Sequence, residues 1–169
     1  ASCLVGSEMC IRDRNISDPN NYLDKEIESK LDHIVNYVLE NESQSKSEIN
    51  LMICCEQEMT KLNKNFRNID DATNVLAFES PNENHIFQTK ELGDLAICYP
   101  LVAKEAKEQF KTKNDHLCHL LVHGVLHILG LDHKVDKDRL IMEDTEINYL
   151  KKFNIQNPYI ICLLYTSDT

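Results

Sequence analysis

The residues from 116 to 129 are apolar on nearly every face, and this segment constrains the fold more than any other part of the chain. A helix that is apolar all round has to be buried, so the remaining elements must cover it. Asp115 is the expected N-cap, and Gly130 is expected to end the helix in a left-handed conformation. The histidines of the segment, which form one narrow polar stripe, are His116, His119, His123 and His127.

His123 and His127 are four residues apart and therefore share one face of this helix. A pair at this spacing does not by itself separate a metal site from core packing. Gly130 allows the chain to turn sharply, so that His133 can return to the same face. Three imidazoles that leave a fourth position open are typical of catalytic zinc. The pattern HGVLHILGLDH therefore predicts a metal site formed by His123, His127 and His133.

This pattern comes close to the metzincin protease motif HExxHxxGxxH, whose Glu acts as the general base. Gly124 occupies the position of that Glu, so hydrolysis of peptides by the protease route is disfavoured. A zinc peptidase with a different base is the weakest alternative. His116 and His119 are expected beside the ligands or at the solvated start of the helix. Asp132 is either a partner that orients a ligand imidazole or a residue of the turn.

Hydrophobic periodicity predicts an α+β fold, in which a small mixed β-sheet is covered by about five helices that include a zincin-like metal-binding helix. We expect a single domain over residues 15–161, with 1–14 and 162–169 as non-native tails. The expected helices are 21–40, 56–66, 100–110, 116–129 and 138–153, and the expected strands are 48–55, 73–78 and 92–99.

The formal net charge of −10 argues against a broad basic surface that binds nucleic acid. It leaves open a local basic cleft or a metal that attracts anions. The seven cysteines are odd in number and contain no CxxC pair, which indicates a reducing compartment rather than a disulfide framework. The longest apolar run, residues 160–165, is too short to span a membrane.

Several segments together resemble the YbeY family of rRNA maturation factors, which are single-strand-specific endoribonucleases. The resemblance covers about residues 20–160. Its motifs are LNKNFRNIDDATNVLAF (62–78), LGDLAIC (92–98), HGVLHILGLDH (123–133), the last helix with Met142, Glu143 and Glu146, and the closing Asn157, Pro158 and Tyr159. Phe66, Ala77 and Leu131 stand where the family commonly has Tyr, Ser and Tyr.

The resemblance implies a zinc-dependent endoribonuclease that acts in rRNA maturation at the 3′ end of 16S rRNA and in ribosome quality control. It implies one zinc ion per chain, or another divalent metal. The implied catalytic residues are Arg67 and the three metal ligands His123, His127 and His133. The main alternative is a ribosome-assembly factor that binds without cutting and whose zinc is mainly structural.

The implied partners are single-stranded RNA, the small ribosomal subunit and ribosome-associated proteins, and no membrane. The implied compartment is the cytoplasm, or an organelle if a targeting segment is missing. The residues add that the planar guanidinium of Arg67 suits phosphate oxygens, although a salt bridge with Asp70 or Asp71 would explain it equally well. Glu143 and Glu146 are expected on the exposed or packing face of the last helix.

Overall fold

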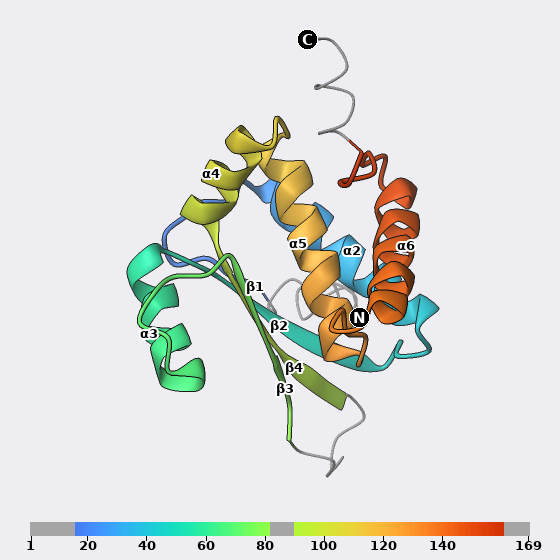
Figure 1. Ribbon diagram of the computed structural model, residues 1–169, viewed down its shortest axis with the longest axis horizontal. Helices are drawn as coiled ribbons and strands as arrows, with labels where there is room; N and C mark the ends of the chain where they lie inside the picture. The colour runs from blue at the N-terminus through green and yellow to red at the C-terminus, as the bar shows by residue number, and fades with distance from the viewer. Residues whose placement is uncertain (1–15, 82–89, 161–169) are drawn as a thin grey trace, which may run out of the picture.

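The computed structural model describes residues 16–81 and 90–160, in which a small twisted sheet carries helices on both faces (Figure 1). The strands lie in the order β1-β2-β4-β3, with β1, β2 and β4 parallel and β3 antiparallel to β4. This mixed sheet and the five helices of the described chain confirm the predicted α+β class. The elements are β1 (Ile16–Ser17), α2 (Lys25–Asn41), β2 (Ser47–Cys54), α3 (Glu56–Arg67), β3 (Val75–Glu79), β4 (Lys90–Cys98), α4 (Tyr99–Glu108), α5 (Lys113–Ile128) and α6 (Asp136–Lys152).

The two faces of the sheet are covered differently, because successive residues of each strand point to opposite sides. One face packs into the main core with α2, α5 and α6, and its central residues are Ile49, Leu51, Ile53, Leu95 and Ile97. The opposite face forms a smaller core with Met59 of α3, and its buried members are Cys54, Leu76, Ala96 and Cys98. The edge strand β3 therefore contributes Ala77 to the first face and Phe78 to the second.

Helix α5 lies at the centre of the main core, in contact with α2, α4, α6, β3 and β4 (Figure 1). Its burial follows from the all-round apolar sequence. A Cβ atom at Gly124 would lie 2.6 Å from Leu95 Cδ2 and 3.4 Å from Val75 Cγ2. The glycine that occupies the base position of the protease motif thus allows the helix to pack closely on β3 and β4.

The first turn of α5 differs from the prediction. The helix spans Lys113–Ile128 rather than 116–129, and its N-cap is Thr112 rather than Asp115. The Thr112 hydroxyl accepts a hydrogen bond from the backbone N–H of Asp115 at 3.1 Å. Thr112 and Asp115 are both good capping residues, and the upstream one is used. Asp115 then lies in the first turn, where a carboxylate interacts favourably with the helix dipole.

The two-residue strand β1 was not predicted, and it extends the sheet by pairing in parallel with Leu51 and Met52 of β2.

The segments expected to be tails, 1–14 and 162–169, lie outside the described residues. Within the described chain, no helix combines the length and apolar character needed to cross a membrane.

Candidate metal centre

The turn after α5 carries His133 back toward the helix, as the sequence predicts. Gly130 has a positive φ of 98°, which L-residues rarely adopt. The backbone N–H of Leu131 donates to the Leu126 carbonyl at 3.0 Å, and that of Gly130 donates to the His127 carbonyl at 3.0 Å. These two bonds form a Schellman motif, which satisfies the last carbonyls of the helix and fixes the direction of the departing chain.

The imidazoles of His123, His127 and His133 converge at this turn. One ring nitrogen from each residue lies within 4.8 Å of the other two. The ring centroids of His123 and His127 are 4.6 Å apart, and that of His133 lies 5.5 Å from the first and 4.9 Å from the second. The three residues form a group that can ligate one ion.

The protonation of the rings also suits a cation. The Nδ1 atom of His123 lies 2.6 Å from Glu146 Oε1, and a neutral ring that donates through Nδ1 keeps a lone pair on Nε2. That Nε2 lies 3.1 Å from the Nε2 of His127. Burial lowers the pKa of His127, and the neighbouring His123 and His133 lower it further, so His127 tends to stay neutral. Neutral imidazoles with converging lone pairs are the form in which histidine binds metal.

Glu146 is the residue of the candidate site that sequence reasoning missed. It is completely buried on α6 and accepts hydrogen bonds from His123, from His119 Nε2 at 2.9 Å and from the Tyr159 hydroxyl at 2.5 Å. Burial alone would raise the pKa of this carboxyl, but the hydrogen bonds from His119, His123 and Tyr159 outweigh it and bring the pKa to about 2. Glu146 is therefore an ionised carboxylate that fixes the orientation of the His123 imidazole, one of the three candidate ligands.

We expect Glu146→Gln to weaken zinc binding about 10- to 100-fold, because an amide oxygen is a weaker acceptor for the His123 ring proton than a carboxylate. The dissociation constant is measured by competition with a chromophoric chelator. Asp144→Asn, which changes an exposed carboxylate of the same helix, is the matched control and should bind zinc like the wild type. Wild-type affinity in Glu146→Gln would show that this carboxylate does not support the site.

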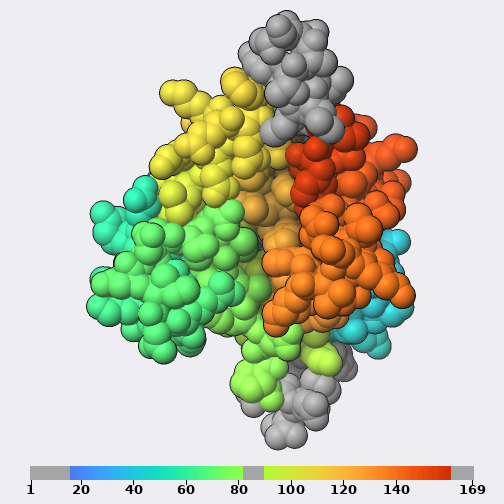
Figure 2. All heavy atoms as spheres, viewed as in Figure 1, coloured from blue at the N-terminus to red at the C-terminus, as the bar shows by residue number. Residues whose placement is uncertain are grey.

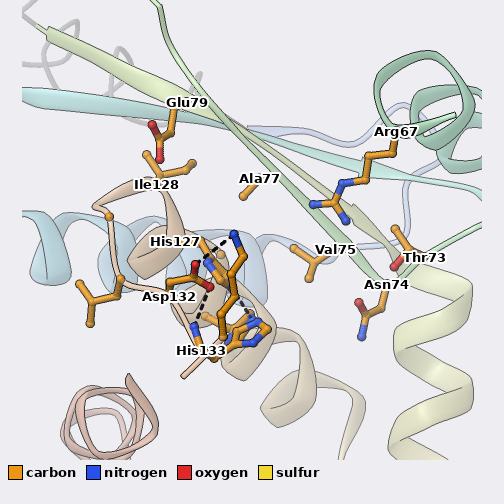
Figure 3. Close-up of a pocket in the computed structure, with 15 residues that line it drawn as sticks. Arg67, Thr73, Asn74, Val75, Ala77, Glu79, His127, Ile128, Asp132 and His133 are labelled. Carbon is orange, nitrogen blue, oxygen red and sulfur yellow. Dashed lines mark hydrogen bonds and ion pairs between the residues drawn. The ribbon is translucent and has the colours of Figure 1, made fainter. Parts of the chain in front are cut away.

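Asp132 serves the turn rather than a ligand ring. Its Oδ1 atom accepts from the backbone N–H of His133 at 2.7 Å, and its Oδ2 lies 3.4 Å from Lys134 Nζ (Figure 3). The hydrogen bond from His133 and the nearby lysine keep the pKa of Asp132 below its usual range. Of the two interpretations that the sequence left open, the geometry supports the turn residue.

The three imidazoles lie at one side of a cavity of about 560 Å³. Its lining comes from α5 and the following turn on one side and from α3, β3 and the segment between them on the other. Figure 2 shows this cavity as a hollow between the green α3–β3 surface and the orange α5–α6 surface. Val75 and Ala77, on the face of β3 that points toward α5, line it as well (Figure 3).

Arg67 lies at the end of α3 and lines the same cavity, across from the histidines (Figure 3). Asp70, which was considered as its salt-bridge partner, instead pairs with Lys64 at 3.5 Å. Asp71 accepts a hydrogen bond from the backbone N–H of Ala72 at 2.9 Å. No hydrogen bond or ion pair holds the Arg67 guanidinium within residues 16–81 and 90–160, so it is available to an anion.

His116 lies apart from the metal group, at the other end of α5. It is buried and its Nε2 lies 2.8 Å from Glu105 Oε2. The same oxygen accepts from the side-chain amide of Asn74 at 3.2 Å, and Asn74 and Thr73 line the cavity. Burial raises the pKa of Glu105, but these two hydrogen bonds bring it below its ordinary value. Glu105 thus connects α4 and α5 to the start of β3, beside the cavity.

Comparison with known proteins gives concordant results. The family model for endoribonuclease YbeY matches residues 14–154. Endoribonuclease YbeY of Acinetobacter baylyi is 40% identical over 142 residues, which cover 82% of this chain and 85% of the relative. Endoribonuclease YbeY of Francisella tularensis subsp. novicida is 41% identical over 119 residues, which cover 69% and 74%. The solution structure of TM1509 from Thermotoga maritima shares the fold, with a TM-score of 0.59 at 23% identity over 90% of this chain and 93% of that one.

Proposed function

This chain belongs to the endoribonuclease YbeY family, and we propose that it is a metal-dependent endoribonuclease that cuts single-stranded RNA in its open cavity. His123, His127 and His133 are the proposed ligands of one zinc ion, or of another divalent metal, per chain. Arg67 is the proposed residue that binds the scissile phosphate. The resemblance in the sequence extends the proposal to rRNA maturation at the 3′ end of 16S rRNA and to ribosome quality control.

One observation carries the proposal: a single cavity contains three converging imidazoles on one side and, on the other, a guanidinium that has no hydrogen bond or ion pair to the described part of the chain. Hydrolysis of a phosphodiester builds negative charge on the non-bridging oxygens, and such charge is stabilised by fixed cationic groups on two sides. A divalent metal at the imidazoles would supply Lewis-acid stabilisation of that charge. Arg67 would hold a second oxygen through its planar fork of N–H donors.

The remaining residues of the site position these groups. Glu146 keeps the His123 ring proton at Nδ1, so that the Nε2 lone pair faces the cavity. The Schellman turn at Gly130 and the Asp132 side chain hold the backbone that carries His133. The site therefore rests on backbone and buried hydrogen bonds, which favours a fixed geometry before substrate arrives.

Solvent access supports a catalytic rather than a mainly structural metal. Structural zinc sites are closed by four protein ligands, whereas catalytic sites keep a position open to substrate. The group formed by the described residues contains three ligands, His133 is exposed, and a cavity opens beside them. This arrangement favours the nuclease over an assembly factor that only binds the ribosome.

The charges of the cavity suit one phosphate rather than a long stretch of backbone. Arg67 and Lys134 are its basic residues, and Glu79 and Asp132 are its acidic ones. With a net charge of −10, the chain has little general attraction for RNA. We therefore propose that the small ribosomal subunit and ribosome-associated proteins bring the RNA to the enzyme.

The proposed setting is the cytoplasm, and the proposed unit is one domain over residues 15–161.

The proposal is tested with one labelled RNA, offered to the zinc-loaded protein either as a single strand or annealed to its complement. The single strand should be cut and the duplex left intact. Removing the metal with a chelator should lower the cleavage rate by about 10²-fold or more, and adding back about one zinc per chain should restore it. Undiminished cleavage by metal-free protein, or equal cleavage of both substrates, would contradict the proposal.

A further inference from the structure

A second cavity, of about 620 Å³, lies on the opposite face of the sheet from the metal centre. Its apolar wall is formed by Met52, Leu62, Phe66 and Phe78, where α3 leaves part of the sheet uncovered. Its polar lining includes Asp94, whose Oδ1 atom accepts from the side-chain amide of Asn50 at 2.9 Å.

Phe66 is the most exposed large hydrophobic residue of the described chain, with 65% of its surface accessible. Its ring packs against Phe78, with the centroids 4.8 Å apart and the planes tilted by 50°. A single exposed apolar side chain needs no explanation. Here, however, the exposed ring lines a cavity and is backed by a second aromatic ring, which is how proteins present a surface for stacking.

The two cavities meet at the edge strand β3. Phe66 and Arg67 are consecutive residues at the end of α3, but Arg67 lines the metal cavity and Phe66 lines the second one. Glu79, the last residue of β3, lines both. A flexible chain held by Arg67 can therefore cross the sheet edge and place its next unit in the second cavity.

We infer that this second cavity binds a nucleobase of the single-stranded RNA, next to the phosphate held by Arg67; this inference rests on the proposed function. Single-stranded RNA is commonly held by stacking its bases on aromatic side chains. Base stacking on Phe66 would also explain selection of single strands, because the bases of a duplex are stacked on one another and are not free to enter.

The charges of the cavity favour a base over the RNA backbone. Its described lining residues include the carboxylates of Glu79 and Asp94 and neither lysine nor arginine, so a phosphate would be repelled. Carboxylates accept hydrogen bonds from the amino groups of bases. Adenine, cytosine and guanine carry such a group and uracil does not, so the cavity should prefer the first three.

The test uses the zinc-loaded protein and a short single-stranded RNA, first intact and then with an abasic nucleotide at each position near the cleaved bond. Phe66→Ala should raise the KM for intact RNA about tenfold with a nearly unchanged kcat. Phe66→Tyr should behave like the wild type. Phe110→Ala is the matched control, because Phe110 is also exposed, at 59%, and lines neither cavity.

The abasic RNAs decide the identity of the occupant. For the RNA that lacks the base bound in the cavity, the KM of the wild type should rise to the value that Phe66→Ala has with intact RNA. Phe66→Ala should have the same KM for this abasic RNA as for intact RNA. An unchanged KM in Phe66→Ala would overturn the inference. The inference would also be overturned if the KM of Phe66→Ala exceeded that of the wild type by the same factor for every abasic RNA. Phe66 would then contact a protein segment or another part of the chain rather than one base.

Equilibrium binding separates this inference from the proposed function. The dissociation constant of the same RNAs is measured by fluorescence anisotropy on chelator-treated protein, in which cleavage is expected to stop. If the wild type binds RNA but never cuts it, the proposed nuclease function is contradicted, and the inferred base site is judged from the dissociation constants alone. If the wild type cuts RNA and Phe66→Ala cuts and binds it equally well, the proposed function stands and the inferred base site is wrong.

Discussion

His127→Ala is expected to remove both metal binding and RNA cleavage. The protein should fall from about one bound zinc per chain to almost none, because the two remaining imidazoles cannot complete a site that the structure builds from three. Cleavage of single-stranded RNA should fall about 10³-fold or more, since the charge stabilisation supplied by the metal is lost. Elemental analysis of the purified chain and a gel assay on labelled RNA measure the two effects.

The same variant distinguishes a catalytic metal from a structural one. Helix α5 is held by completely buried apolar residues such as Leu117, Leu121 and Leu126, whereas His127 is only half-buried, so the packing of the helix does not depend on His127. His127→Ala should therefore melt close to the temperature of the metal-free wild type, since bound metal itself stabilises the folded state. Unfolding of the variant would favour a structural metal, and retained cleavage without metal would contradict the proposed mechanism. His33→Ala, which changes an exposed histidine of α2, should be neutral.

The parts of the fold that were predictable are those in which one sequence signal dominates. All-round apolarity identified α5, and Gly130 followed by His133 identified the return of the chain to the metal group. The first turn of α5 was misplaced because Thr112 and Asp115 offer competing caps. The strand β1 was missed because two residues carry no periodicity, and only pairing with β2 defines it.

Glu146 was missed for a different reason. A glutamate in a charged helix usually faces solvent, and α6 as a whole shows little separation of polar and apolar faces. A signal was nevertheless present, because Glu146 lies four residues after Met142 and four before Leu150, and both of these are buried. A carboxylate in line with two core residues has to find donors inside the protein. Here the donors are His119, His123 and Tyr159.

Arg67→Ala is expected to lower kcat/KM for single-stranded RNA about 10²- to 10³-fold while leaving the zinc content unchanged. The guanidinium is exposed, lines the cavity and contacts none of the three imidazoles, so its removal should disturb neither the fold nor the ligands. Arg67→Lys should recover only part of the activity, because an ammonium retains the charge but not the planar pair of donors. Arg139→Ala, which changes an exposed arginine of α6 outside the cavity, is the control.

The division of this loss between kcat and KM tells what Arg67 does. If the guanidinium stabilises charge that develops on the phosphate during cleavage, most of the loss will be in kcat. If Arg67 only anchors the ground-state RNA, KM will rise and kcat will stay near the wild-type value. Wild-type kinetics in Arg67→Ala would show that the guanidinium takes no part in cleavage and that the three imidazoles act without it. Loss of zinc from the variant would instead show that α3 supports the metal centre, a role for which the described contacts give no basis.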